Sequence, residues 1–597
     1  MMLKIKNNKL FFKYVFAFLI ILLFQINHIY LYASNENIAP EISTGINTQK
    51  SVTAKDFIVV SANKFASEAG YQIIEKGGNA VDAAIAVQMV LNIVEPQSSG
   101  IGGGGFLLYY DSEKKRVISF DGRETAPSKA TEKLFLDENN EPMSFMEAIK
   151  GGRSVGTPGL IRMLQIAHGK YGKLKWKELF IPAIKLAKNG FPLSPRLHKM
   201  LSEIEHQKSD DEMQKLYYGK NGNPLDIGTI IKNNKLAKVF TEIADNPDNF
   251  YEGEIAKDIV RTVNNNKFSK GSLSLEDLKN YKAYEKSSIC RLYKDNKICG
   301  MTTPSSGGIT ILQIMGILNN FKINDLQFPS VKAISVISEA SRLAFADRNK
   351  YIADSLFTSV PTDRMLDPSY LEKRADLIRE NLIKDDSIIP SVEAGEISTD
   401  YNLYSMLDDF ERPSTTHISI IDKKGNAVSM TSSIEYAFGS GTMVNGFLLN
   451  NQLSDFSFVP EKDNMKIANR VEANKRPRSS MSPTIILDKN DNLKMVVGSP
   501  GGSRIIGYVM QTIIAVLDWK YDIQKAINMP HIISKSRNIV ELEKGYDLDK
   551  YADELNKLGY KTVVRDLNSG LHAIYVNENG TLTGAADPRR EGYAIGK

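Results

Sequence analysis

Residues 414–421 constrain this chain more than any other segment, because they begin an alternating strand directly after a charged stretch that Pro413 interrupts. From Thr415 the strand reads Thr-Thr-His-Ile-Ser-Ile-Ile. If the peptide bond between Ser414 and Thr415 breaks, Thr415 gains a free α-amine that can activate its own hydroxyl as a nucleophile. An ordinary junction between a loop and a strand is the alternative, because threonine is common in strands.

The residues that follow predict a second strand paired with the first. Residues 422–426 read Asp-Lys-Lys-Gly-Asn, which is a turn signal between two apolar runs. Of the seven histidines only His417 lies close to a motif, and we interpret it as a strand residue with satisfied hydrogen bonds. The histidines therefore predict no metal cluster, and no cofactor is expected.

Several uncommon strings occur in a fixed order along the chain. They are Asn-Ala-Val-Asp-Ala-Ala at 79–84, Ser-Ser-Gly-Ile-Gly-Gly-Gly-Gly at 98–105, Asp-Gly-Arg-Glu-Thr-Ala-Pro at 121–127, Pro-Ser-Ser-Gly-Gly at 304–308, Leu-Leu-Asn-Asn-Gln-Leu-Ser-Asp-Phe at 448–456, Asn-Lys-Arg-Pro-Arg-Ser-Ser-Met-Ser-Pro-Thr at 474–484 and Gly-Ser-Pro-Gly-Gly-Ser-Arg at 498–504. With the strand at Thr415, these strings resemble γ-glutamyltranspeptidases over residues 55–597.

This resemblance implies a fold and a processing event. The expected fold is the α/β N-terminal nucleophile hydrolase type, a four-layer α/β/β/α sandwich. It is made as one precursor that cleaves itself between Ser414 and Thr415. The expected products are a large subunit of residues 56–414 and a small catalytic subunit of residues 415–597, which stay interlocked.

The resemblance also implies the chemistry. Thr415 would attack the γ-carbonyl of glutathione or a related γ-glutamyl compound, and water or an acceptor amine of an amino acid or dipeptide would resolve the ester. Ser433 stands where many members carry a second threonine that orients the nucleophile, and it lacks the methyl group that restricts that rotamer. Gly501 and Gly502 would direct two N–H groups at the negative oxygen.

The same resemblance assigns the residues that hold the donor. Arg123 would bind its carboxylate, because a guanidinium can make two parallel charge-assisted bonds. Ser479 and Ser480 would add hydroxyl donors. Asp455 would bind the ammonium group, supported by Gln452 and Glu435.

Three other functions remain open at this stage. Between Ser457 and Arg478 the only aromatic residue is Phe458, so we expect no closed aromatic lid over the site. This leaves open poly-γ-glutamate as the substrate of a depolymerase or transpeptidase of the same fold. An exported amino-acid-binding protein that is never processed is the second. A serine acyl-enzyme using Ser61 and Lys64 is the third, although its partner motifs do not follow.

Composition and the N-terminus set the compartment and the partners. A net charge of +5 on 597 residues, with both signs interspersed, is not the basic stripe of a nucleic-acid-binding protein. Four lysines precede the apolar run 14–24, which suits a signal peptide over residues 1–33 cleaved after Ala33. An uncleaved anchor is the alternative. We expect a periplasmic or secreted protein, no membrane contact beyond that segment, and a disordered lead over residues 34–55.

Four local expectations complete the sequence picture. Residues 62–93 predict two helices broken at Gly77-Gly78, and residues 333–351 predict an amphipathic helix whose charges face solvent or form ion pairs. Residues 100–105 match a dinucleotide fingerprint, but a strand follows where that motif needs a helix, so close backbone approach is the better interpretation. Cys290 and Cys299 flank a possible hairpin turn, and their pairing stays open.

Overall fold

The computed structural model describes residues 43–397, 404–406, 414–535 and 537–597. The expected signal peptide, residues 1–33, and the first part of the expected lead, residues 34–42, lie outside these residues. None of the helices in the described ranges is long and apolar enough to span a bilayer.

Two seven-stranded sheets form the centre of the unit that comprises residues 41–597. The nucleophile sheet contains, in spatial order, β23 (Tyr593–Gly596), β2 (Ile58–Ser61), β10 (Thr415–Ile421), β11 (Ala427–Ser433), β3 (Gly104–Asp111), β4 (Arg116–Gly122) and β7 (Tyr284–Ser287). The second sheet contains β1 (Val52–Ala54), β22 (Leu582–Ala586), β21 (His572–Val576), β17 (Leu493–Gly498), β16 (Thr484–Asp488), β9 (Asn296–Gly300) and β8 (Ile289–Tyr293).

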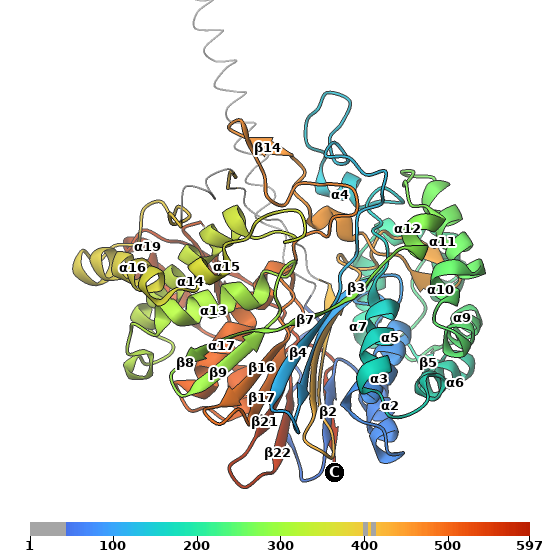
Figure 1. Ribbon diagram of the computed structural model, residues 1–597, viewed down its shortest axis with the longest axis horizontal. Coiled ribbons are helices and arrows are strands. Elements are labelled where there is room, and N and C mark those ends of the chain that lie inside the picture. The colour runs from blue at the N-terminus through green and yellow to red at the C-terminus, as the bar shows by residue number, and fades with distance from the viewer. Residues whose placement is uncertain (1–42, 398–403, 407–413, 536) are drawn as a thin grey trace, which may run out of the picture. The chain divides into compact units, whose positions relative to one another are not determined.

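Helices cover the outer face of each sheet (Figure 1). The nucleophile sheet packs against α2 (Lys64–Glu75), α3 (Ala80–Val94) and α5 (Leu160–Tyr171), and α6 (Ile181–Asn189) packs on α3. The second sheet packs against α13 (Gly307–Leu318) and α17 (Ile505–Leu517), and α14 (Val331–Tyr351) and α16 (Pro368–Ile378) pack on α13. This order of layers confirms the predicted α/β/β/α sandwich.

Smaller elements lie around these layers. They are the helices α4 (Phe145–Ala148), α7 (Pro195–Glu203), α8 (Asp211–Tyr217), α9 (Asn234–Asp245), α10 (Asn249–Glu252), α11 (Glu254–Asn264), α12 (Leu275–Lys279), α15 (Thr362–Met365), α18 (Ile523–Asn528) and α19 (Ala552–Lys557), the three-stranded sheet β18 (Ile532–Ser534), β19 (Ile539–Glu543), β20 (Lys561–Arg565), and the pairs β5 (Phe191–Pro192) with β6 (Ile230–Ile231), β12 (Met443–Val444) with β13 (Phe447–Leu448), and β14 (Glu461–Lys462) with β15 (Met465–Lys466).

The predicted pairing of the two strands after Ser414 is confirmed. Strands β10 and β11 run antiparallel, and their register places Thr415 opposite Ser433. Ile418 and Ile420 belong to the apolar layer under α3. The alternate residues His417 and Ser419 lie between the sheets, where Ser419 Oγ donates to the carbonyl oxygen of His572 at 3.0 Å. The alternation therefore sets which faces of β10 meet the helices and the second sheet.

Two expectations about local structure need correction. The lead was expected to be disordered to residue 55, but Val52–Ala54 forms β1, which pairs with β22 because that sheet offers it an unpaired edge. The charges of residues 333–351 were expected to face solvent or form ion pairs. Ion pairs are confirmed, because Arg342 pairs with Glu339 at 2.7 Å and Asp347 with Arg374 at 3.4 Å. A solvated face is wrong, because α13, α16 and β18 pack against α14 and nearly all of it is buried, Arg348 included. The Arg348 guanidinium contacts serine hydroxyls.

Two other features match or resolve the sequence picture. Helices α2 and α3 are separate, with Gly77-Gly78 between them, as expected. Cys290 in β8 and Cys299 in β9 stand opposite each other and form a disulfide, which answers the open question of their pairing.

Candidate active site

Thr415 begins β10 at one end of the nucleophile sheet and is 4% exposed. Strand β2 pairs with β10 only from Ile418 onward, so the first residues of β10 have a neighbouring strand on one side, β11. The Thr415 Oγ1 hydroxyl donates to Ser433 Oγ at 3.3 Å. A nucleophile at a strand end of this kind is held by the sheet and still reached from the loops.

Ser433 lies between the nucleophile and the expected cleavage site, and its side chain makes three hydrogen bonds, the first of them with Thr415. The Ser433 hydroxyl donates to the carbonyl oxygen of Ser414 at 2.7 Å, and its oxygen also accepts from the Glu435 N–H at 2.8 Å.

A Cβ on Gly103 would lie 2.1 Å from the Ser433 carbonyl oxygen. Only glycine allows the backbone directly before β3 to lie this close to the end of β11. This confirms close backbone approach as the role of the glycine run.

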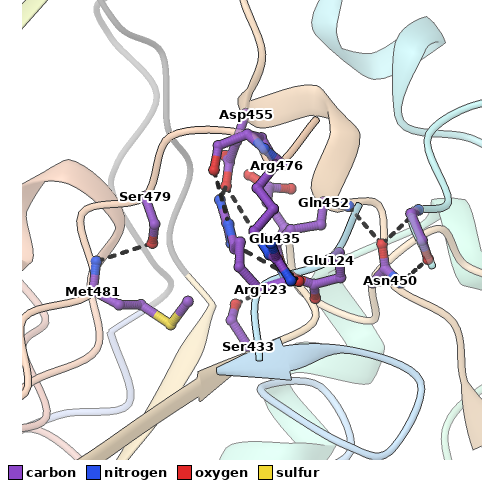
Figure 2. Close-up of polar contacts among 12 residues, drawn as sticks. Arg123, Glu124, Ser433, Glu435, Asn450, Gln452, Asp455, Arg476, Ser479 and Met481 are labelled. Carbon is purple, nitrogen blue, oxygen red and sulfur yellow. Dashed lines mark hydrogen bonds and ion pairs between the residues drawn. The ribbon is translucent and has the colours of Figure 1, made fainter. Parts of the chain in front are cut away.

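Arg123 follows β4 and is fully buried. Figure 2 shows its side chain directed at Asp455. Its Nη2 donates to Asp455 Oδ2 at 2.5 Å and to the carbonyl oxygen of Arg478 at 2.8 Å. The Gln452 Nε2 amide donates to the same Asp455 oxygen at 2.7 Å. The structure therefore brings the candidate carboxylate-binding and ammonium-binding residues into one cluster, in which they also pair with each other.

Two residues that the sequence analysis missed hold the backbone of Arg123. The Tyr281 hydroxyl donates to its carbonyl oxygen at 2.6 Å, and Arg476 Nε donates to the same oxygen at 3.2 Å. Burial acts to raise the pKa of Asp121, but Arg476 and Lys286 outweigh it and keep that pKa below its usual range. Asp121 therefore stays charged and accepts from the Arg123 N–H at 2.9 Å.

Glu124 is a buried acid directly beside Arg123. Burial raises the pKa of Glu124 to about 8, although the Arg123 guanidinium opposes this change. The ion pair is long, with 3.7 Å between Arg123 Nη1 and Glu124 Oε2. A largely neutral Glu124 at pH 7 leaves the charge of Arg123 directed at Asp455 and at an incoming carboxylate.

Glu435 holds an uncommon backbone conformation next to Ser433. Its φ is +76°, which costs a residue with a side chain about 1–3 kcal/mol. Its carboxylate accepts from Asn451 Nδ2 at 2.5 Å. Asn451 also accepts from the Tyr436 N–H at 3.0 Å through its side-chain oxygen. This asparagine was not among the predicted site residues, and its place in the Leu-Leu-Asn-Asn-Gln string was the only sequence signal for it.

Ser479 and Ser480 lie against the turn that precedes α13. The Ser306 N–H and hydroxyl both donate to the carbonyl oxygen of Ser479 at 2.7 Å. Ser305 Oγ donates to the carbonyl oxygen of Met481 at 2.7 Å. Ser480 Oγ accepts from Arg348 Nη2 at 2.7 Å. The Pro-Ser-Ser-Gly-Gly string at 304–308 thus supports the Ser-Ser pair at 479–480.

Gly501 and Gly502 form the turn between β17 and α17. Their φ angles are +136° and +59°, which glycine adopts at little cost. Strand β17 ends at Gly498, where a Cβ would lie 2.2 Å from the His417 ring, so this turn lies at the Thr415 end of β10. Among the described residues neither glycine N–H donates to a protein acceptor. Both remain candidates for the oxyanion hole.

Two predictions about other residues can be compared with the structure. His417 is buried, with Nδ1 2.8 Å from Thr431 Oγ1 and Nε2 3.1 Å from Ser419 Oγ, so its interpretation as a satisfied strand residue is confirmed. Ser61 and Lys64 make no acyl-enzyme pair: Ser61 Oγ is 2.7 Å from Ser67 Oγ, whereas the Lys64 side chain is 61% exposed and faces Glu68.

Residues 457–478, for which no closed aromatic lid was expected, leave the site region at Asp455. Phe458 stacks on Phe135 with 4.6 Å between the ring centroids, which fixes the start of the segment. Its tip is the hairpin of β14 and β15, whose residues are exposed and carry no aromatic ring. Phe458 is therefore a packing residue, and the tip offers no aromatic side chain for closing over a ligand.

Comparisons with known proteins agree with this architecture. Residues 66–597 match the family described as Gamma-glutamyltranspeptidase. The chain is 38% identical to a glutathione hydrolase proenzyme of Bacillus subtilis, over 91% of this chain and 92% of the relative. A crystal structure of Helicobacter pylori gamma-glutamyltranspeptidase covers 59% of this chain and 97% of its own, with a TM-score of 0.53 and 32% identity. A cephalosporin acylase structure from Bacillus halodurans shares the fold, with a TM-score of 0.77 and 24% identity over 94% of this chain and 98% of its own.

Proposed function

The chain belongs to the γ-glutamyltranspeptidase family, and we propose that Thr415, released as a chain terminus, is its nucleophile. As a member of that family it is an enzyme that hydrolyses the γ-glutamyl bond of glutathione-type compounds or transfers the γ-glutamyl group. It is made as a proenzyme and processed into two subunits. The roles of individual residues below are proposals.

Self-cleavage begins with attack of Thr415 Oγ1 on the carbonyl carbon of Ser414. The new C–O bond forms, the C–N bond of the peptide breaks, and the Thr415 nitrogen takes the proton from the hydroxyl. Water then hydrolyses the resulting ester. Ser433 supports this step, because its hydroxyl already donates to the carbonyl oxygen on which negative charge develops.

Turnover repeats this chemistry on the donor. The free α-amine of Thr415 takes the hydroxyl proton as Oγ1 attacks the γ-carbonyl of the donor. The leaving amine receives that proton, and a γ-glutamyl ester of Thr415 remains. Water or an acceptor amine attacks the ester, and Thr415 recovers its proton. Gly501 and Gly502 supply N–H donors to the oxyanion of both steps.

The buried cluster at Arg123 binds the amino-acid end of the donor. Arg123, Ser479 and Ser480 take the α-carboxylate, while Asp455, Gln452 and Glu435 take the ammonium group. The two charges of the donor are a few bonds apart, and the Arg123 and Asp455 groups that would bind them already lie side by side, paired at 2.5 Å. A zwitterion inserted between them replaces one ion pair with two.

The observation that carries this proposal is the contact of Ser433 with both Thr415 Oγ1 and the Ser414 carbonyl oxygen. It is tested by mass spectrometry of the purified protein and by hydrolysis of γ-glutamyl-p-nitroanilide. We expect a fragment that begins Thr-Thr-His and release of p-nitroaniline. A fully active, unbroken chain would exclude Thr415 as nucleophile, whereas an inactive, unbroken chain that binds glutamate would favour an unprocessed binding protein.

We also propose that the protein acts after export, in the periplasm or outside the cell, with amino acids or dipeptides as acceptors. The apolar run after the N-terminal lysines supports export. The disulfide between Cys290 and Cys299 is consistent with an oxidising compartment. Fractionation of cells, with detection of the small subunit in each fraction, tests this location.

A further inference from the structure

The last turn of α14 lies beside the Ser479–Ser480 turn, and Arg348 connects the two. Arg348 is fully buried. Its Nε donates to Ser306 Oγ at 2.8 Å, its Nη1 to Asn349 Oδ1 at 2.9 Å and its Nη2 to Ser480 Oγ at 2.7 Å. One guanidinium thus reaches two serine hydroxyls that lie 174 residues apart in the chain, at positions 306 and 480.

Ser306 extends this contact to the neighbouring residue. While its oxygen accepts from Arg348, its hydroxyl donates to the carbonyl oxygen of Ser479 at 2.7 Å. The Arg478 guanidinium ties the same region from the other side, because its Nη1 donates to the carbonyl oxygen of Arg348 at 3.0 Å. The segment directly before Ser480 is therefore fixed relative to the end of α14.

The contact also orients the Ser480 hydroxyl. A serine hydroxyl has one hydrogen and two acceptor sites. Since the oxygen of Ser480 accepts from a cation, its hydrogen must point away from the guanidinium. In the part of the chain that the structure describes, this O–H has no protein acceptor. The Ser480 O–H is therefore a donor whose direction is fixed and which is available to a ligand oxygen.

We propose that Arg348 is a positioning residue that presents the Ser480 hydroxyl to the α-carboxylate of the γ-glutamyl donor. This inference rests on the proposed function, in which Ser480 binds that carboxylate. Arginine suits the position because its planar fork reaches Ser306 and Ser480 at the same time. A lysine ammonium is a single point donor on a flexible stem and would hold at most one of them well.

The experiment compares Arg348→Lys with Arg342→Lys. Arg342 lies on the same helix, is 1% exposed and donates to Glu339 at 2.7 Å and to the carbonyl oxygen of Ile389 at 3.1 Å. Both variants keep the charge and lose the fork. In the mature enzymes we expect Arg348→Lys to raise the KM for γ-glutamyl-p-nitroanilide about tenfold, the scale of one hydrogen bond to a charged group, with kcat changed less than about threefold. Arg342→Lys should leave KM within about twofold.

A Ser480→Ala background separates positioning from general damage. If Arg348 acts through Ser480, Arg348→Lys should change KM by less than about twofold once the hydroxyl is gone, because coupled residues are not additive. A full tenfold effect in that background, or a lower kcat at unchanged KM, overturns the inference. Arg348→Gln, which keeps one amide donor, serves if the lysine variant does not fold.

Calorimetric binding of L-glutamate gives a readout that does not depend on turnover. We expect the Kd of Arg348→Lys to rise about as much as its KM. If the wild-type protein cleaves γ-glutamyl-p-nitroanilide and the Arg348→Lys variant has the same KM and Kd as wild type, this inference alone is overturned. A mature wild-type protein that neither cleaves that amide nor binds L-glutamate overturns the proposed function, and this inference with it.

Discussion

Ser433 donates a hydrogen bond to the carbonyl oxygen of Ser414, 2.7 Å away, across the bond that is expected to break. The same oxygen of Ser433 accepts from Thr415 Oγ1 at 3.3 Å. A single side chain thus contacts both the nucleophile and the group that it attacks. Ser433 therefore bears on the nucleophile in both self-cleavage and turnover, while its contact with the Ser414 carbonyl serves cleavage alone.

Ser433→Ala should slow self-cleavage. The variant loses the donor to the developing oxyanion, a loss that typically costs on the order of 100-fold in rate. The time course of subunit appearance on denaturing gels, starting from freshly purified precursor, measures it. Ser433→Thr keeps the hydroxyl and should cleave at close to the wild-type rate. An alanine variant that matures as fast as wild type would exclude this role.

Tyr281→Phe should weaken donor binding from a distance. The Tyr281 hydroxyl donates to the Arg123 carbonyl oxygen at 2.6 Å, and Arg476 alone would remain to hold that oxygen. We expect KM for γ-glutamyl-p-nitroanilide to rise about threefold to tenfold, the scale of one hydrogen bond. Tyr251→Phe is the matched control: its ring stacks on Tyr281, but its hydroxyl donates to Pro158 instead. Equal effects of the two substitutions would indicate general loosening of the loops.

Family resemblance predicted the fold and most candidate site residues, whereas local sequence pattern predicted the strand pair at Thr415 for a physical reason. Thr415 and Ser433 lie on adjacent strands joined by a short turn, so alternation and turn chemistry are enough to pair them. Arg123, Asp455 and Ser480 were found only through family strings. No local pattern shows that residues 332 positions apart, such as Arg123 and Asp455, form an ion pair at 2.5 Å.

What was missed depends on partners that are distant in sequence. Arg348 stands on a helix whose charges fit a solvated face equally well, and its serine partners are distant in the chain. Tyr281 follows a short helix and carries no motif. Strand β1 is three residues long, too short for a period-two signal, and pairs with residues 582–584 near the other end of the chain.

The disulfide should stabilise the enzyme without serving catalysis. Cys290 and Cys299 join β8, the edge strand of the second sheet, to β9. In the loop-entropy account, closing so short a loop contributes about 2 to 3 kcal/mol. We therefore expect Cys290→Ser/Cys299→Ser to unfold at lower urea concentration and to keep its KM. A free-thiol count on unfolded, unreduced wild-type protein should be zero, and a count of two would contradict the bond.

Four buried histidines should make the protein sensitive to acid. Burial lowers the pKa of His206 and His572 to about 4, and lowers the pKa of His417 and His531 well below the usual value. The unfolded chain binds these protons below about pH 6.5, and the folded chain does not. Stability is therefore full above that pH and falls as the pH drops toward 4. Urea midpoints measured from pH 7.5 to 4.5 test this.

Arg123→Lys should separate donor binding from processing. The lysine keeps a charge near Asp455 but cannot reproduce the fork that reaches Asp455 and the carbonyl oxygens of Pro477 and Arg478 together. Among the described residues no hydrogen bond joins Arg123 to Ser414, so self-cleavage should proceed, while KM for γ-glutamyl-p-nitroanilide rises about tenfold to 100-fold. Gel analysis and steady-state kinetics on one preparation measure both. Unchanged KM would remove the carboxylate assignment, and failure to cleave would show that Arg123 also shapes the precursor.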